Sequence, residues 1–173
     1  MTGKGSVNHN SRKFHAKNTD PERSCLNVEY CNENIKDVYH ELFDEALARY
    51  NEKQTRSDRI INDYYEKICS GKQEKPFHEI ILQIGNKDDM GAKTEDGQLA
   101  AKILDEYMQD FQRRNPTLRV FSAYLHMDVK YSIVLIVYGV YRVREKLKIG
   151  TTYTNRKKNV YEVKWNGIGK TSK

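Results

Sequence analysis

The pattern of hydrophobic and polar positions changes near residue 35. Over residues 1–34 apolar side chains are scattered among Asn, Ser, Gly, Lys and Arg, which predicts mostly loop. From Ile35 to Tyr50 apolar residues recur every three or four positions, so they share one stripe of a helix. Residues 57–69 repeat this spacing before Ser70-Gly71, which predicts a second helix.

The next part of the chain predicts a strand followed by a helix. Residues 77–84 form a short isoleucine-rich run after Pro76, as expected of a strand. Residues 98–115 precede Pro116 and are predicted to form an amphipathic helix. Its expected core stripe has a four-residue step: Leu99, Ile103, Tyr107 and Phe111.

Two further strands are predicted, at 118–128 and 131–141. The first alternates, and the side containing Phe121 and Leu125 is the expected core side. The opposite side ends in His126 and Asp128, so we expect it to present His126 to a site. The second run is mainly β-branched and aromatic, which favours an inner strand.

The charge of the chain is uneven. Of a net charge of +6, residues 129–173 hold 11 Lys or Arg against two Glu, a net charge of +9, which leaves −3 for residues 1–128. All five histidines also precede residue 128. The sequence therefore predicts two segments, 1–128 and 129–173, of different origin or role.

Composition places the chain among polar, single-domain proteins. Its 173 residues are 38% apolar and 31% charged, enough for one core. It contains neither a signal core nor an apolar run of about 18 residues, so we expect a cytoplasmic protein with no membrane partner. The three cysteines have no metal-ligand spacing and are expected to be reduced thiols.

Three short strings of residues share one resemblance. Residues 3–12 end in His-Asn-Ser-Arg, residues 20–30 include Ser-Cys-Leu-Asn, and residues 123–128 end in His-Met-Asp. In this order, residues 1–128 resemble the MobV relaxases, the plasmid mobilisation and recombination enzymes also called Pre/Mob. The resemblance implies an α/β (α+β) fold of the HUH-relaxase type, an antiparallel sheet with packed helices that is incomplete here. It also implies a protein that binds plasmid transfer-origin DNA, with no small-molecule substrate.

The resemblance assigns roles to the first two strings. His9 matches the family histidine that attacks a DNA phosphodiester and remains joined to the 5′ phosphate, as a neutral imidazole can do. Asn10 would orient the imidazole or the DNA, and Arg12 would pair with a phosphate oxygen. Asn27 is a further DNA-binding candidate, whereas Cys25 replaces a histidine found in many relatives. The alternative is that His9 and Arg12 are polar residues of a mobile terminus.

The third string implies only part of a metal site. His126 matches the first of three histidines that hold Mn or Mg in intact relatives, but no histidine follows it here. The spacing of His15, His40 and His78 supplies no replacement, so we expect metal binding to be weak or absent. The family is a metal-dependent DNA strand transferase, and such a cation contributes several kcal/mol to catalysis. Whether this chain is an active enzyme therefore stays open.

The basic segment 129–173 begins inside the family's metal motif. This onset suggests that a longer relaxase reading frame was interrupted. Relatives have a strand before residues 3–12, where only Met1 and Thr2 stand here, so we expect either that the true start lies upstream or that the domain lacks an edge strand. Arg156, Lys157 and Lys158, with aromatic neighbours, are candidate DNA contacts; the alternative is a solvated basic tail. Three hypotheses remain: a nicking enzyme, a DNA-binding module without nicking activity, and a non-functional disrupted product.

Overall fold

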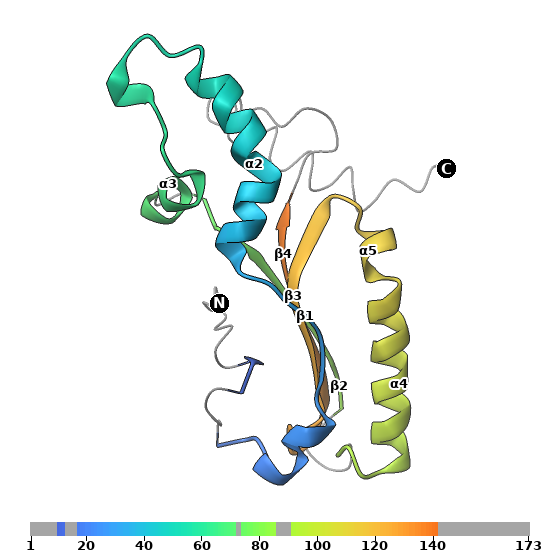
Figure 1. Cartoon of the computed structure of the whole chain (residues 1–173). Coiled ribbons are helices and arrows are strands. Elements are labelled where there is room, and N and C mark those ends of the chain that lie inside the picture. The colour runs from blue at the N-terminus through green and yellow to red at the C-terminus, as the bar shows by residue number, and fades with distance from the viewer. Residues whose placement is uncertain (1–9, 13–16, 72–73, 86–90, 142–173) are drawn as a thin grey trace. The chain divides into compact units, whose positions relative to one another are not determined.

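A computed structural model describes residues 10–12, 17–71, 74–85 and 91–141, and every structural statement below concerns these residues. Figure 1 shows the elements in chain order. They are the 3-10 helix η1 (Pro21–Leu26), β1 (Val28–Asn32), α2 (Ile35–Asn51), the 3-10 turn η2 (Ser57–Arg59), α3 (Tyr64–Ser70), β2 (His78–Ile84), α4 (Glu95–Gln109), α5 (Phe111–Arg114), β3 (Leu118–His126) and β4 (Ile133–Tyr141).

The strands form one four-stranded sheet in the order β1-β3-β4-β2. β1 runs antiparallel to β3, with Val28 opposite Leu125, and β2 runs antiparallel to β4, with His78 opposite Gly139. β3 and β4 are neighbours joined by a short connection, which only an antiparallel pair allows. The fold is therefore mixed α+β with an antiparallel sheet, as the resemblance implied, and β4 is an inner strand, as its apolar run predicted.

The expectation that only one side of β3 is a core side was wrong. Phe121 is buried on one side, but Ser122, Tyr124 and His126 on the other side are buried as well. β3 lies between β1 and β4, and α4 and α5 both contact it. Residues on both faces of this inner strand are buried, so the alternation of polar and apolar residues did not indicate exposure.

Helix α4 presents a different side to the core from the one expected. Leu99 and Ile103 are 57% and 49% exposed. The buried positions are mainly small ones: Gly97, Ala100, Ala101 and Leu104. The helix also begins earlier than predicted because the Thr94 hydroxyl caps it, accepting from the Gly97 amide at 3.0 Å. A Cβ at Gly97 would lie 2.0 Å from the Gly91 oxygen, so only glycine fits this first turn.

Two other expectations need correction. The helix expected over 57–69 is divided into η2 and α3, because Asp63 caps a new helix and accepts from the Glu66 amide at 2.9 Å. Within residues 1–34, the short elements η1 and β1 were not predicted. β1 is a short edge strand with mixed polar and apolar residues, which explains why no periodic pattern predicted it.

The described residues divide into two compact units. One holds the sheet with α4 and α5, and the other spans Asn34 to Pro76. In the second unit the Tyr39 ring packs 5.1 Å from the rings of both Phe43 and Tyr65, and its hydroxyl donates to the Pro76 oxygen at 2.8 Å. No helix among the described residues combines the length and apolar character needed to cross a membrane.

Candidate functional site

Arg12 and Asp128 form a two-pronged ion pair at the end of β3. The Arg12 Nε donates to the Asp128 Oδ2 at 2.6 Å, and a second guanidinium nitrogen donates to Oδ1. The Asp128 side chain is fully buried and that of Arg12 is 10% exposed. Arg12 has a φ of 54°, a left-handed conformation that costs a non-glycine residue about 1 kcal/mol or more. The ion pair therefore holds this segment in a conformation that it would not favour alone.

Further polar contacts hold Asp128 in place. The Ser24 hydroxyl donates to its Oδ2 at 3.1 Å. The Asn27 side-chain oxygen accepts from the backbone amides of Met127 at 2.7 Å and Asp128 at 3.2 Å. Burial raises the pKa of Asp128, but the hydrogen bonds and the charge of Arg12 outweigh it and lower this pKa to about 2. The carboxylate is ionised at neutral pH.

The ion pair brings together the three strings recognised in the sequence. Arg12 comes from the first, Ser24 and Asn27 from the second, and Asp128 from the third. Backbone pairing supports the arrangement: the Asp20 amide donates to the Asp128 oxygen at 2.8 Å, and the Lys130 amide to the Asn18 oxygen at 3.1 Å. Residues that are distant in the sequence thus form one polar cluster, which we call the Asp128 cluster: Arg12, Ser24, Asn27 and Asp128.

Asn10 is fixed at a separate place on the sheet. Its side chain is buried, and its Nδ2 donates to the hydroxyl of Tyr138 on β4. That hydroxyl in turn donates to the Glu79 Oε1 on β2 at 2.6 Å. Burial first, and then the neighbouring Glu79 carboxylate, raise the pKa of Tyr138, so the phenol keeps its proton.

His126 does not line an open site in this structure. It is 1% exposed, and its ring lies parallel to that of Tyr124, with the ring centroids 5.9 Å apart. We expected β3 to present His126 to a site, and the structure instead buries this side chain together with its neighbours on the strand. Its metal assignment stays a prediction.

The described residues do not fit a divalent metal. No group of three His, Cys, Asp or Glu side chains among them is placed to hold one. Asp128, two residues after His126, has both carboxylate oxygens bonded to Arg12. His40 contacts Asp44 on the exposed side of α2 at 3.0 Å, and His78 begins β2. We therefore derive no chemical step through a metal.

Several predicted site residues lie outside the described part of the chain. These are His9, Arg156, Lys157 and Lys158. The role of His9 remains a prediction from the resemblance, and the DNA contacts of the three basic residues remain predictions from their charge and aromatic neighbours. The division of the chain at residue 128 also remains a prediction. β4 lies beyond that division and belongs to the same sheet as β3.

The structure adds residues that sequence reasoning missed. Asp128 was noted in the third string without a partner, and Ser24 in the second string without a role. Tyr138 and Glu79 were treated as ordinary strand residues. A signal was present for the last pair, because a glutamate in the apolar run of β2 lies opposite a tyrosine in the apolar run of β4.

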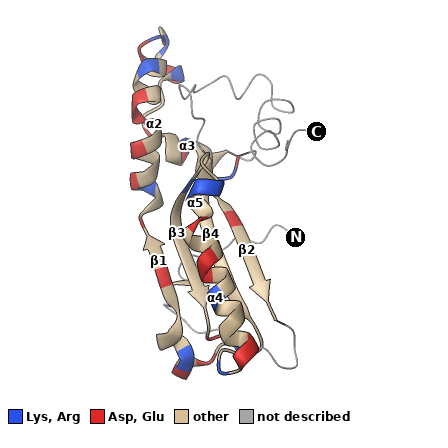
Figure 2. Ribbon diagram, turned by 90° about the vertical axis from the view of Figure 1, so that its right-hand side faces the viewer, with Lys and Arg blue, Asp and Glu red and all other residues tan. Residues whose placement is uncertain are grey.

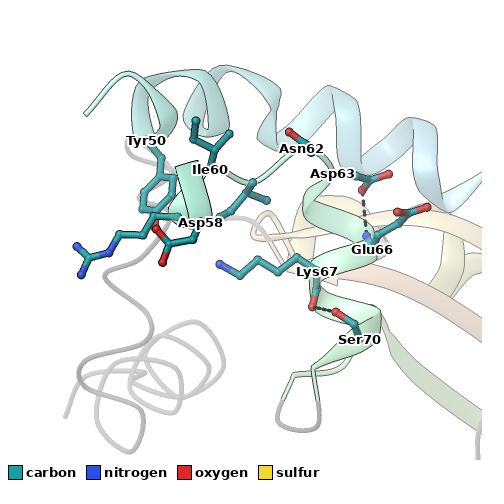
Figure 3. A pocket seen from close by; sticks show the side chains of 10 residues that line it. Tyr50, Asp58, Ile60, Asn62, Asp63, Glu66, Lys67 and Ser70 are labelled. Atoms are coloured by element: carbon teal, nitrogen blue, oxygen red, sulfur yellow. Dashed lines mark hydrogen bonds between the residues drawn. The ribbon is translucent and has the colours of Figure 1, made fainter. Parts of the chain in front are cut away.

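The second unit contains an open pocket between the end of α2, η2 and α3 (Figure 3). Lys67 and Arg59 line it together with Asp58, Asp63 and Glu66. The Lys67 ammonium lies 6.0 Å from the centre of the Tyr50 ring. Acidic and basic side chains thus line the pocket together, so it has no positive charge bias toward an anion such as DNA. Figure 2 shows charges of both signs on α2 and on α4.

No curated protein matches the chain. A similar solved structure is the Mn-bound MobM relaxase domain (MOBV; Mob_Pre) with plasmid pMV158 oriT DNA; it is 20% identical, with 91% of this chain and 70% of that chain covered and a TM-score of 0.46. The model of the Mob_Pre family, plasmid recombination enzyme, matches residues 2–164, which include all three strings. The chain belongs to the Mob_Pre family of plasmid recombination enzymes.

Proposed function

We propose that this chain binds plasmid transfer-origin DNA and that its strand-cleaving activity is weak or absent. Membership of the plasmid recombination family supports the DNA partner. The incomplete set of metal ligands supports the weak cleavage. The same proposal places the protein in the cytoplasm, where plasmid DNA is found.

The observation that carries the proposal is the Arg12–Asp128 ion pair. It fastens the first string to the end of β3, within the same cluster as Asn27 of the second string. Polar residues that are scattered in sequence and assembled by a fold are typical of a site rather than of a terminus without structure. We therefore favour the site interpretation of Arg12 over that of a mobile polar end.

The chemistry proposed for intact relatives needs several groups, and this chain has only some of them. A neutral imidazole of His9 would form a bond to phosphorus while the 3′ oxygen leaves, and negative charge would build up on the phosphoryl oxygens. In the described structure the Arg12 guanidinium is paired with Asp128 rather than with a phosphate. With the metal ligands incomplete as well, we propose that cleavage is slow and that binding dominates.

The basic segment would supply electrostatic affinity. Residues 129–173 have a net charge of +9, and Arg156, Lys157 and Lys158 are its densest run. Each phosphate neutralised releases counterions, so binding should weaken steeply with salt. A DNA-binding module without origin preference would show the same salt dependence, and so only a comparison of sequences separates the two.

The experiment is a fluorescence anisotropy titration. Labelled overlapping fragments of the DNA that flanks the gene are compared with shuffled fragments of equal length and composition, over a series of salt concentrations. The proposal predicts one fragment bound at least about tenfold more tightly than its shuffled counterpart, near the low end for specific over non-specific DNA binding. Equal binding of all fragments would support the unspecific module, and no cooperative unfolding transition would support the disrupted product.

A further inference from the structure

We propose that Tyr138 and Glu79 are positioning residues for the string that contains His9. They act through Asn10, which is joined to His9 by a peptide bond. The inference rests on the proposed function, because only there does the placement of His9 matter to DNA. Neither residue would touch DNA in this role.

The direction of the hydrogen bonds supports this role. A phenol has a single proton, and Tyr138 donates it to the Glu79 carboxylate at 2.6 Å. The oxygen of Tyr138 is then left as an acceptor, which is what the Asn10 amide requires. Glu79 thus determines that the hydroxyl receives a donor from the N-terminal string.

The packing around Tyr138 fixes where this acceptor lies. The Tyr138 ring meets the Phe77 ring edge-on, with centroids 5.4 Å apart, and the Phe121 ring at 6.2 Å. The side chain is fully buried, and Glu79 lies directly opposite it on β2. The hydroxyl is therefore held by rigid sheet and aromatic contacts rather than by a loop.

Two side chains of the string, two positions apart, are held by the sheet unit. Asn10 is bonded to Tyr138 on β4, and Arg12 to Asp128 beyond β3. Fixing both residues restricts the backbone that immediately follows His9, which narrows the positions its imidazole can take. Preorganisation of this kind reduces the entropy lost when the string binds DNA.

A purely structural role for these residues is less well supported. Phenylalanine at 138 would provide nearly the same ring packing, and Glu79 is a half-buried carboxylate in an otherwise largely apolar strand. A hydroxyl and a carboxylate that are brought together at such a place contribute little to apolar packing. Their shared product is an acceptor for Asn10.

The test compares Tyr138→Phe and Glu79→Gln with Tyr131→Phe, a matched control in which the same hydroxyl is removed from a tyrosine that is 53% exposed. In the full chain, nuclear magnetic resonance would follow the Asn10 side-chain amide and the titration of the His9 imidazole. We expect Tyr138→Phe to move both signals and Tyr131→Phe to leave them unchanged. Glu79→Gln keeps an acceptor oxygen, so a smaller change in the same direction is expected.

Affinity for the origin fragment separates the inference from the function on which it rests. If the wild-type chain prefers the fragment, Tyr138→Phe should weaken that preference several-fold. Absence of preference in the wild type overturns the proposed function, whatever the variants do. Preference in the wild type with unchanged His9 and Asn10 signals in both variants overturns the inference. If Tyr138→Phe fails to fold, the Glu79→Gln signals decide alone.

Discussion

Arg12 and Asp128 are separated by 116 positions in sequence, yet the Arg12 Nε lies 2.6 Å from the Asp128 Oδ2. The pair joins the first and last of the three strings that identify the family. Because Asp128 is fully buried, the carboxylate depends on these partners for its charge. The contribution of the pair to stability can therefore be measured by substitution and by acid. The sequence did not predict that these two residues pair.

Replacing Asp128 with Asn should destabilise the fold strongly. The substitution leaves a nearly buried guanidinium without its counter-ion, a loss of about 3 kcal/mol in comparable sites. Urea unfolding followed by circular dichroism measures the free energy. Asp110→Asn is the control, because Asp110 pairs with Arg113 on the surface and exposed pairs contribute little to stability. Equal effects of the two substitutions would contradict the account.

Acid should remove the contribution of the Asp128 ion pair. The pKa of Asp128 is lowered from 3.8 to about 2, so its stabilising effect is complete above pH 5 and is lost as the pH falls toward 2. This lowering of the Asp128 pKa corresponds to about 2 kcal/mol in the free energy of unfolding. Unfolding free energies of the wild type and of Asp128→Asn, measured over this range, should converge as the pH falls. Curves that stay parallel would show that the Asp128 pKa is not lowered by folding.

Asn27→Ala should lower the free energy of unfolding by about 2 kcal/mol, because two backbone amides lose their acceptor. The Asn27 side-chain oxygen accepts from the amides of Met127 and Asp128, and both donors would lose this partner. Asn32→Ala, at an exposed position of β1, is the matched control and should change the unfolding free energy by less than about 0.5 kcal/mol. Faster hydrogen exchange of the Met127 amide in Asn27→Ala would identify the cause. Unchanged exchange there would contradict it.

Manganese should not stabilise this protein measurably. A ligand that binds the folded state raises its stability in proportion to the logarithm of ligand concentration over Kd, and the described residues offer no complete site. At 1 mM Mn²⁺, a site with a Kd of about 10 μM would add roughly 3 kcal/mol to the free energy of unfolding. We expect thermal unfolding with and without 1 mM Mn²⁺ to give the same Tm within about 1 °C. A saturable increase of several degrees that is lost in His126→Ala would contradict this expectation.

The sequence predicted the sheet best where its pattern was strongest. The runs over 77–84 and 131–141 became β2 and β4, and the family resemblance supplied the α+β class. The hydrophobic pattern did not predict β1, which is short and polar, and it predicted the wrong buried side for α4. There Ala100 and Ala101 are buried in place of Leu99, because small residues let a helix approach a sheet closely.

The candidate site was predicted as a set of residues but not as a set of contacts. Local strings indicated Arg12, Asn27 and His126, yet no pattern showed that Arg12 pairs with Asp128. Burial of His126 was also missed, because it depends on neighbours of β3 that are distant in sequence. Contacts between such segments are decided by tertiary packing, which short motifs do not report.

The most direct test of the central claim is relaxation of a supercoiled plasmid that carries the flanking DNA, with Mn²⁺ or Mg²⁺, by the wild type and His9→Ala. The account predicts binding of the origin fragment with little or no relaxation and no covalent protein–DNA adduct in either protein. Efficient metal-dependent relaxation by the wild type, with an adduct that His9→Ala abolishes, would contradict it.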